Sequence, residues 1–343
     1  MATINDVARL AGVSISTVSY TLSGNRSIAE STRNRVVSAI QELGYRPNAG
    51  ARMLAGTRTR IFALTAPVRA DTQSGVLMSF VLAVATAARK IDYDVLLLTA
   101  DEASTGLERV TSSRLADGII ALDVSLDDER MPLLRALNIP ATVIGVPADT
   151  DGLVCVDLDF EGAASLAVSR LADLGHRSIG LLGLPRSTYA WGANYPLRFR
   201  DGFLAAAAER NVATAFVMPA TDMDSIRRSI DELFASLPNM TALVMHAGES
   251  VQTTVLEILA SRGLSIPGQL SVISACAVFD TSEFSPPLDE IPLSAEDSGV
   301  RAVELTIRQI NGDRTPHIDL LPARYVERGS TGPAPIREVL AGV

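Results

Sequence analysis

The sequence predicts a small all-α head followed by an α/β core of two doubly wound parallel sheets. Apolar residues recur at helical spacing through the first 45 residues, with short turns between the helices. From Arg60 onward, short apolar strands alternate with amphipathic helices, and this rhythm restarts after the Pro/Asp/Gly-rich residues 147–152. Two successive runs of strand–helix units predict two such sheets. A chain of 343 residues, 47% of them hydrophobic, is long enough for two or three domains.

The first two predicted helices form a helix-turn-helix. Thr3 can cap a helix over residues 4–11, and Gly12 stands where a left-handed residue would end it. Ser14 caps the second helix, whose inward apolar residues recur at i, i+3 and i+7: Ile15, Val18 and Leu22. The residues that face outward are polar: Ser16, Thr17, Ser19 and Tyr20. A second helix of this kind fits the major groove of DNA.

A third amphipathic helix is expected over residues 31–43, ending at Gly44. Its inward residues are Val36, Val37, Ile40 and Leu43. Residues 47–56 follow, a segment too short to be a stable helix alone, with one exposed apolar pair at Met53 and Leu54. Helical hairpins are common in ordinary cores, so two helices alone predict a helix-turn-helix only weakly. The third helix and the segment at residues 47–56 strengthen this prediction.

Positive charge is concentrated at the amino-terminal end of the chain. The first 60 residues hold eight arginines against three acidic residues, a net charge of +5, so the chain's net charge of −9 leaves −14 on the remainder. A basic head on an acidic body is typical of a DNA-binding domain attached to another module. We expect the arginines to contact phosphates; the alternative is a solvated surface.

Strands and helices alternate along the core. The expected strands of the first run are residues 61–66, 93–99, 118–122 and 141–145, and those of the second are 153–156, 179–183, 215–218, 242–245 and 270–275. The expected helices lie near residues 74–90, 102–116, 129–137, 160–174, 197–210, 225–235, 250–262 and 296–311. Ligands of such sheets bind beyond the carboxyl ends of the strands, so two facing sheets predict a cleft that can close on a ligand.

Several stretches resemble the LacI/GalR family of bacterial transcription regulators. They are ATINDVARLAGVSISTVS at the amino terminus, TRNRVVSAIQELGYRPN at residues 32–48, LAG at residues 54–56, CVDLDFEGAASLAVSRLADLGHRSIGLLG at residues 155–183 and SPPLDEIPLSAEDSGVRAVEL at residues 285–305. The resemblance implies a helix-turn-helix domain at residues 1–46, a hinge helix and linker at 47–59, and a periplasmic-binding-protein-like core at 60–343. In such a core the N-subdomain is expected at about 60–157 and 290–318, and the C-subdomain at about 158–289 and 319–343.

The resemblance also implies which residues contact DNA. Matches to the family's reading positions place Ile15, Ser16 and Tyr20 at base edges; the family often has Arg where Tyr20 stands, so the operator is expected to differ at that step. Phosphate contacts are expected from Thr3, Asn5, Ser14, Thr17, Ser19 and Asn25, each of which could instead serve only in capping or solvation. In the hinge helix, Leu54 matches the residue that wedges into the minor groove, beside Asn48 and Ala51.

The expected ligand cleft has one aromatic loop. Residues 184–199 hold the single tryptophan, Trp191, with Tyr189 and Tyr195, in a chain that is only 5% aromatic. Aromatic faces beside a cation suit a sugar, and Arg198 is the best candidate for hydroxyl contacts; packing in the core or at an interface is the alternative. The other polar candidates are Arg69, Asp71, Gln73, Asp157, His246, Glu249 and Cys276.

The chain departs from the family at three ligand positions. Cys276 and Gly145 stand where carboxylates are usual, and Phe199 stands where the ligand arginine is usual. A small monosaccharide is therefore not expected to sit here as it does in better-known members. A fainter resemblance to the actinobacterial cellobiose-responsive branch implies cellobiose or another oligosaccharide.

Other protein classes find little support. The three histidines and two cysteines lack metal-ligand or disulfide spacing, and no nucleotide-binding or nucleophile motif occurs, so neither a cofactor nor an enzyme is expected. A transport binding protein would have no use for residues 1–60. With no run of eighteen apolar residues and no signal peptide, a cytoplasmic protein without membrane contact is expected.

The leading interpretation is a homodimeric repressor that binds a palindromic operator in double-stranded DNA and is released by a small carbohydrate. Palindromy follows from the two-fold pairing of two heads. One alternative makes the ligand a corepressor, which changes only the sign of the coupling. Another is a carbohydrate-binding or enzymatic core with an accessory DNA-binding head.

Overall fold

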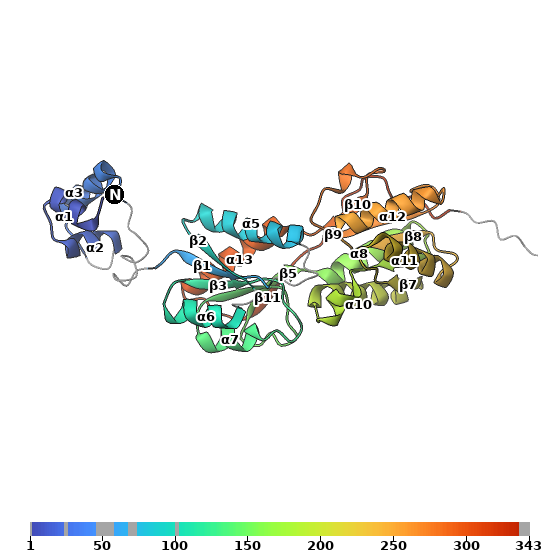
Figure 1. Ribbon diagram of the computed structural model, residues 1–343, viewed down its shortest axis with the longest axis horizontal. Helices are drawn as coiled ribbons and strands as arrows, with labels where there is room; N and C mark the ends of the chain where they lie inside the picture. Colours follow the sequence, from blue (N-terminus) through green and yellow to red (C-terminus); the bar gives the residue numbers. More distant parts are fainter. Residues whose placement is uncertain (1, 24–26, 46–57, 68–73, 100–102, 336–343) are drawn as a thin grey trace, which may run out of the picture.

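A computed structural model describes residues 2–23, 27–45, 58–67, 74–99 and 103–335. Several predicted site residues lie outside these ranges: Asn25 in the head, Asn48, Ala51 and Leu54 in the hinge segment, and Arg69, Asp71 and Gln73 beside the expected cleft. Figure 1 shows a helical head at one end, followed along the long axis by two α/β subdomains.

The head consists of three helices: α1 (Ile4–Ala11), α2 (Ile15–Ser23) and α3 (Glu30–Leu43). The predicted caps are confirmed. Thr3 and Asp6 form a capping box at the start of α1, and Gly12 ends that helix with a left-handed φ of 62°. The Ser14 hydroxyl accepts a 3.2 Å hydrogen bond from the Thr17 amide at the start of α2, and left-handed Gly44 ends α3.

The head core is narrower than predicted. Val7, Val18 and Val36 are completely buried, but Ile15 and Leu22 are 49% and 42% exposed, and Val37 is 42% exposed. The inward placement of these three side chains was therefore wrong. Helix α2 is only nine residues long, and among its described side chains Val18, near its middle, is the one contribution to the buried core of the head.

The first sheet is parallel throughout and has the strand order β11-β5-β4-β3-β1-β2. Its strands are β1 (Ile61–Thr65), β2 (Asp94–Leu98), β3 (Gly118–Ala121), β4 (Ala141–Ile144), β5 (Val154–Leu158) and β11 (His317–Leu321). Helices α5 (Ser74–Lys90) and α13 (Ala295–Ile310) lie side by side on one face, and α6 (Ala103–Ser112) and α7 (Arg130–Leu137) cover the other (Figure 1).

The second sheet is also parallel, with the order β10-β9-β8-β6-β7. Its strands are β6 (Ser178–Leu182), β7 (Ala213–Val217), β8 (Ala242–Met245), β9 (Ser271–Ala277) and β10 (Asp289–Pro292). Helices α8 (Phe160–Asp173) and α10 (Asn194–Glu209) pack on one face, and α11 (Met223–Ser236) and α12 (Glu249–Ser261) on the other. Two short elements complete it, α9 (Arg186–Ala190) and the 3-10 helix η2 (Thr281–Glu283).

The predicted fold class, a helical head followed by two doubly wound sheets, is confirmed. The subdomain limits differ at two places, because β10 joins the second sheet and all of β11 joins the first. Residues 290–292 thus belong to the C-subdomain and residues 319–321 to the N-subdomain. Neither strand was predicted, because β11 is a half-exposed edge strand and β10 begins with two acidic residues. Among the described residues, no helix is long and apolar enough to cross a bilayer.

Candidate functional site

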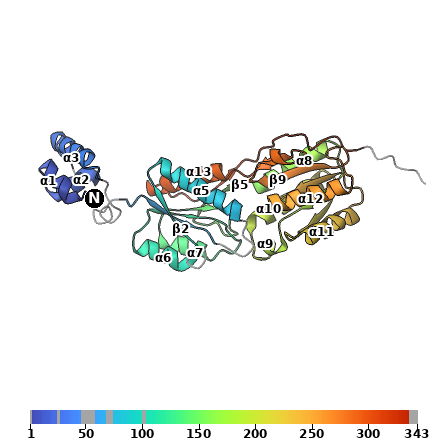
Figure 2. The ribbon, with the colours of Figure 1, turned by 45° about the horizontal axis from the view of Figure 1, so that its top comes forward.

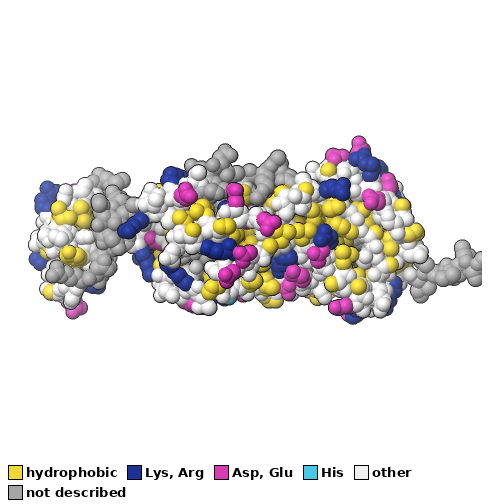
Figure 3. Space-filling view, turned by 90° about the horizontal axis from the view of Figure 1, so that it is seen from below, with side chains coloured by type: hydrophobic (Ala, Val, Ile, Leu, Met, Phe, Trp, Pro, Cys, Tyr) yellow, Lys and Arg dark blue, Asp and Glu magenta, His cyan; other side chains and the backbone are white. Residues whose placement is uncertain are grey.

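The outward face of α2 presents the residues predicted to read bases. Ile15 is 49% exposed and Tyr20 is 39% exposed, and Ser16 is exposed beside them. Ile15 and Ser16 are adjacent and Tyr20 lies about one turn later, so the three side chains can enter a groove together. Figure 3 shows basic side chains on the head with few acidic ones, whereas both signs are interspersed over the core.

The predicted phosphate contacts divide into two groups. Thr3 and Ser14 are engaged in caps: Thr3 hydrogen-bonds with Asp6, and the Ser14 hydroxyl lies 2.8 Å from the Thr17 hydroxyl. Asn5 is exposed, whereas Thr17 and Ser19 are half-buried. The caps satisfy free amides in the first turns of α1 and α2, so Thr3 and Ser14 have a structural role in the head.

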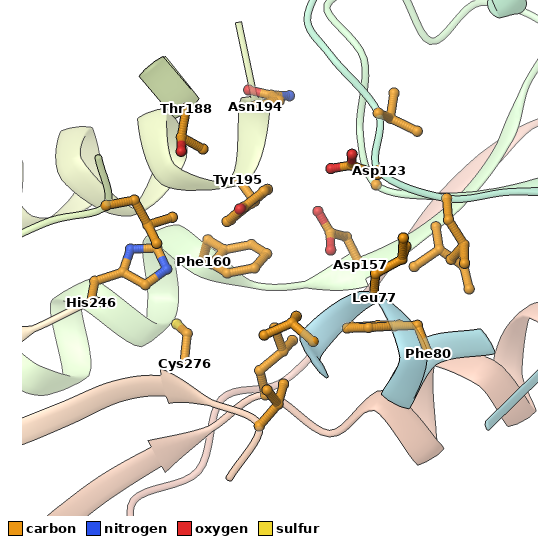
Figure 4. A pocket seen from close by; sticks show the side chains of 18 of the residues that line it. Leu77, Phe80, Asp123, Asp157, Phe160, Thr188, Asn194, Tyr195, His246 and Cys276 are labelled. Atoms are coloured by element: carbon orange, nitrogen blue, oxygen red, sulfur yellow. The ribbon is translucent and has the colours of Figure 1, made fainter. Parts of the chain in front are cut away.

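A cavity lies between the two subdomains at the carboxyl ends of both sheets, where the predicted cleft was expected. Figure 4 shows side chains from both subdomains converging on it. Residues that follow β3, β4, β5, β6, β8 and β9 line it, together with α5 and the segment around α9. The predicted residues on its wall are Asp157, Trp191, His246 and Cys276, joined by Gly145 and Tyr195.

Three predicted ligand residues do not line the cavity. Arg198 is engaged in ion pairs: its Nε and Nη2 donate to the Glu161 carboxylate at 2.7–3.0 Å, and its Nη1 donates to Asp157 at 2.9 Å. Tyr189 packs edge-on against Phe216, with ring centroids 5.7 Å apart. Glu249 is exposed at the start of α12. The guanidinium of Arg198 thus donates to the two carboxylates, and its expected role as a donor to ligand hydroxyls stays a prediction.

Asp157 is the acidic group at the centre of this network. Burial raises the pKa of Asp157 to about 7, against the lowering effect of the Arg198 charge. The Glu161 carboxylate, which is more exposed, has its pKa lowered, because the hydrogen bonds and charge of Arg198 outweigh its partial burial. Near neutral pH the Asp157 carboxyl can thus both donate and accept hydrogen bonds at the cavity wall.

His246 forms the opposite wall as a neutral ring. Burial lowers the pKa of His246 to about 3, and its Nδ1 has no hydrogen-bond partner among the described residues. Its ring is packed among Phe160, Tyr195 and Phe199, at centroid distances of 4.5–6.1 Å. A neutral imidazole offers one donor and one acceptor, which suits an uncharged hydroxyl.

Gly145 and Cys276 stand on the cavity wall at the two positions where carboxylates would be usual. Gly145 has a φ of +127°, and a Cβ placed there would lie 3.1 Å from the Val124 Cβ, so a side chain at this position would be strained and tightly packed against Val124. Cys276 is buried, and burial raises the pKa of its thiol well above the ordinary value. Among the described residues, no group of three His, Cys, Asp or Glu side chains could hold a metal ion.

Several wall residues were not predicted. They are apolar or uncharged for the most part: Leu77, Phe80, Asp123, Phe160, Thr188, Asn194 and Phe279. Asp123 lies two residues after the end of β3, so the strand-end rule applied to the third strand would have found it. Leu77 and Phe80 are one and two turns into α5, and periodicity alone could not distinguish them from core residues.

Comparison with known proteins gives matches over both parts of the chain. Residues 3–48 match the family described as bacterial regulatory proteins, lacI family, and residues 168–331 match the periplasmic binding protein-like domain. The transcriptional regulator AglR of Rhizobium meliloti (strain 1021) is 29% identical, covering 98% of this chain and 96% of the relative. The transcriptional repressor PurR of Actinobacillus pleuropneumoniae is 28% identical, covering 92% and 94%.

Solved structures agree on the fold. The lac repressor dimer bound to operator and the anti-inducer ONPF has a TM-score of 0.77 at 23% identity, covering 96% of this chain and 99% of that one. The transcriptional regulator CelR in complex with cellobiose has a TM-score of 0.65 at 23% identity, covering 96% and 100%. The chain thus matches the lacI-family model in its amino-terminal head and the periplasmic binding protein-like model in its core, and the relatives that it resembles over most of their length are transcriptional regulators.

Proposed function

We propose that the protein is a transcriptional repressor that binds a palindromic operator as a homodimer and leaves it when a small carbohydrate occupies the cleft. The observation that carries this proposal is the combination, in one chain, of an exposed reading face on α2 with a cavity enclosed by two subdomains. The lacI-family match of the head supports DNA binding, and the PurR relative supports repression.

DNA recognition would follow from the chemistry of the head. Ile15, Ser16 and Tyr20 would face base edges in the major groove, while arginines contact phosphates and release counterions. Leu54, with Asn48 and Ala51 beside it, would enter the minor groove at the centre of the operator. There, an apolar wedge trades a few kcal/mol of base unstacking for a bent and more fully contacted duplex.

An exposed apolar surface on the N-subdomain supports the homodimer. On α5, Met78 and Leu82 are 49% and 59% exposed, and Leu97 on the neighbouring edge strand β2 is 41% exposed. Leu97 lies on the same face of the sheet as α5, because Val95, two residues earlier, packs in the core beneath that helix. A second copy of the chain would cover this surface.

The cavity suits an uncharged carbohydrate. Trp191, Tyr195 and Phe160 offer aromatic surface for the apolar faces of a sugar ring, and Asp157, Asn194 and His246 offer donors and acceptors for its hydroxyls. The carbohydrate would be cellobiose or another oligosaccharide; the CelR structure that shares the fold holds cellobiose. Closure of the two subdomains around it would change the spacing of the paired hinge segments and so lower the affinity for the operator.

The test compares the full chain with a variant lacking residues 1–58. A symmetric site is selected from random duplexes, and mono- and disaccharides are screened by calorimetry. We expect the full chain to prefer one palindrome, with steep salt dependence, and the truncated chain to lose DNA but keep the sugar. The proposal fails if no symmetric site is preferred over random duplex, with or without each sugar. A sugar that tightens operator binding would instead make it a corepressor.

A further inference from the structure

The two subdomains are joined by backbone hydrogen bonds as well as by the covalent crossovers. Ser125 and Ala193 form an isolated antiparallel bridge, and the Leu126 amide donates to the Gly192 carbonyl at 2.8 Å. We call residues 125–126 and 192–193 the clasp. The Asn194 side chain adds a hydrogen bond to the Val146 carbonyl. Helix α9, which leads into the clasp, lies at the junction with the N-subdomain on the side of α7 (Figure 2).

Cavity wall and clasp are built from the same two segments. On the N-subdomain side, Asp123 and Val124 line the cavity directly before clasp residues 125–126. On the C-subdomain side, Trp191 and Asn194 line it on either side of residues 192–193. A displacement of the clasp must therefore displace four wall residues.

A buried arginine holds the N-subdomain half of the clasp in place. Arg130 is the bulkiest side chain that the described part of the chain buries completely. Its Nε and Nη2 donate to the Asp128 carboxylate at 2.8 and 2.6 Å, its Nη2 also donates to the Asp123 carbonyl at 3.1 Å, and its Nη1 reaches the Thr65 carbonyl at 3.4 Å.

Asp128 completes the connection from Arg130 to the clasp. Its Oδ2 accepts from the Ser125 amide at 3.3 Å. Although burial raises the pKa of Asp128, the hydrogen bonds and charge of Arg130 outweigh it, so the pKa is lowered and the carboxylate stays charged. Arg130 thus fixes both ends of the loop at residues 123–128 against the end of β1.

We propose that Arg130 is a positioning residue for the cleft: without touching the cavity, it sets the clasp that keeps the two subdomains closed around the ligand space. This inference rests on the proposed function for the identity of the ligand, but the clasp itself can be tested without ligand or DNA. The sole tryptophan, adjacent to Gly192, is the natural reporter.

The first experiment replaces the buried pair by uncharged residues in the double variant Asp128→Asn/Arg130→Met, which leaves no unpaired buried charge. The control is the same exchange in the exposed pair Asp231→Asn/Arg262→Met on the outside of the C-subdomain. Acrylamide quenching of Trp191 and hydrogen exchange of the Leu126 amide are measured, with the β4 amides as the internal reference for folding.

We expect the Trp191 quenching constant to rise at least twofold and the Leu126 amide to exchange at least tenfold faster in the Asp128/Arg130 variant, with β4 unchanged. The control variant should show neither effect. Unchanged quenching and exchange in a folded variant would overturn the proposal, and so would an equal acceleration in the control.

A second variant keeps the proposal testable if the first does not fold. Ser125→Cys/Ala193→Cys places cysteines at directly opposed positions of the antiparallel bridge, where Cα separations of about 4.5–5.5 Å permit a disulfide. We expect oxidation to lower Trp191 quenching below that of the wild type, and reductant to restore it. A disulfide that forms but leaves the quenching constant unchanged would contradict the clasp. Neither result depends on sugar or operator binding, so failure here is distinct from failure of the proposed function.

Discussion

At the scale of single residues, backbone geometry decides what the cleft can bind. Gly145 combines a φ of +127°, which side chains rarely adopt, with a 3.1 Å approach of its missing Cβ to the Val124 Cβ. A side chain at this position would therefore be strained and would press on Val124, whereas Asp157, Asn194 and His246 supply polar groups to the cavity wall. The loop after β4 thus packs closely on the loop after β3.

We expect Gly145→Ala to destabilise the protein. The control is Gly312→Ala, a site with a φ of +106° and no atom within 4 Å of the added Cβ, so that only the backbone strain is shared. Overpacking against Val124 should make Gly145→Ala cost about 1–3 kcal/mol more than the control in the free energy of unfolding, measured by urea denaturation. Equal costs in the two variants would show that the Val124 contact has no effect.

At the scale of elements, strands with continuous apolar runs were predictable, whereas the edge strands β10 and β11, which carry acidic residues, were not. Strands β1, β3 and β8 are continuous apolar runs, so the sequence marks them clearly. Strand β10 is buried although it begins with two acidic residues, because hydrogen-bond donors at residues 325–331 pair with their carboxylates. Likewise, the cavity wall was predicted near the carboxyl ends of strands, as with Asp157 at the end of β5 and His246 directly after β8. The ion pair of Arg198 with Glu161 was not predicted, because Glu161 lies on another helix and no local pattern reveals it.

Asp289, the first residue of β10, attaches residues 325–331 to the second sheet. Its carboxylate accepts hydrogen bonds from the Tyr325 hydroxyl at 2.5 Å, from the Thr331 hydroxyl at 2.6 Å, and from three consecutive amides beginning at Arg328. Burial raises the pKa of Asp289, but these donors outweigh it and lower the pKa below its ordinary value.

The depressed pKa fixes the direction of the pH dependence. Below the ordinary pKa of about 4, the unfolded chain binds a proton that folded Asp289 does not, so its contribution is present above that pH and lost as the pH falls through the folded pKa. We expect Asp289→Asn to cost about 2–4 kcal/mol in the free energy of unfolding at pH 7 and less near pH 3. Asp224→Asn, at an exposed position in the first turn of α11, serves as the control. An Asp289→Asn cost that is the same at pH 7 and pH 3 would exclude this role.

At the scale of the whole molecule, the proposed assembly places two heads on one symmetric site. Helix α5 packs on α13 with one face and presents Met78 and Leu82 on another, next to Leu97 of β2. Helix α5 therefore connects the apolar surface to the cavity, because Leu77 and Phe80 of the same helix line the cavity wall. A shift of α5 on ligand closure would reach the partner subunit directly.

We expect Leu82→Glu to convert the dimer to a monomer, because two buried carboxylates would face each other or lie against apolar residues across the two-fold axis. Sedimentation velocity checks this, with Leu204→Glu, 42% exposed on α10 of the C-subdomain, as the matched control. Operator affinity should fall at least tenfold for Leu82→Glu alone. A Leu82→Glu variant that sediments as a dimer would place the interface elsewhere.

The position of β11 has a consequence for synthesis on the ribosome. All five strands of the second sheet emerge between residues 178 and 292, so they can pair with one another before residues 325–331, which satisfy the Asp289 carboxylate, are added. The first sheet begins earlier but waits for α13 and for residues 317–321, which pair with β5. Until then, the nascent chain carries an uncovered apolar edge, and this interval is where chaperone binding or premature aggregation would occur.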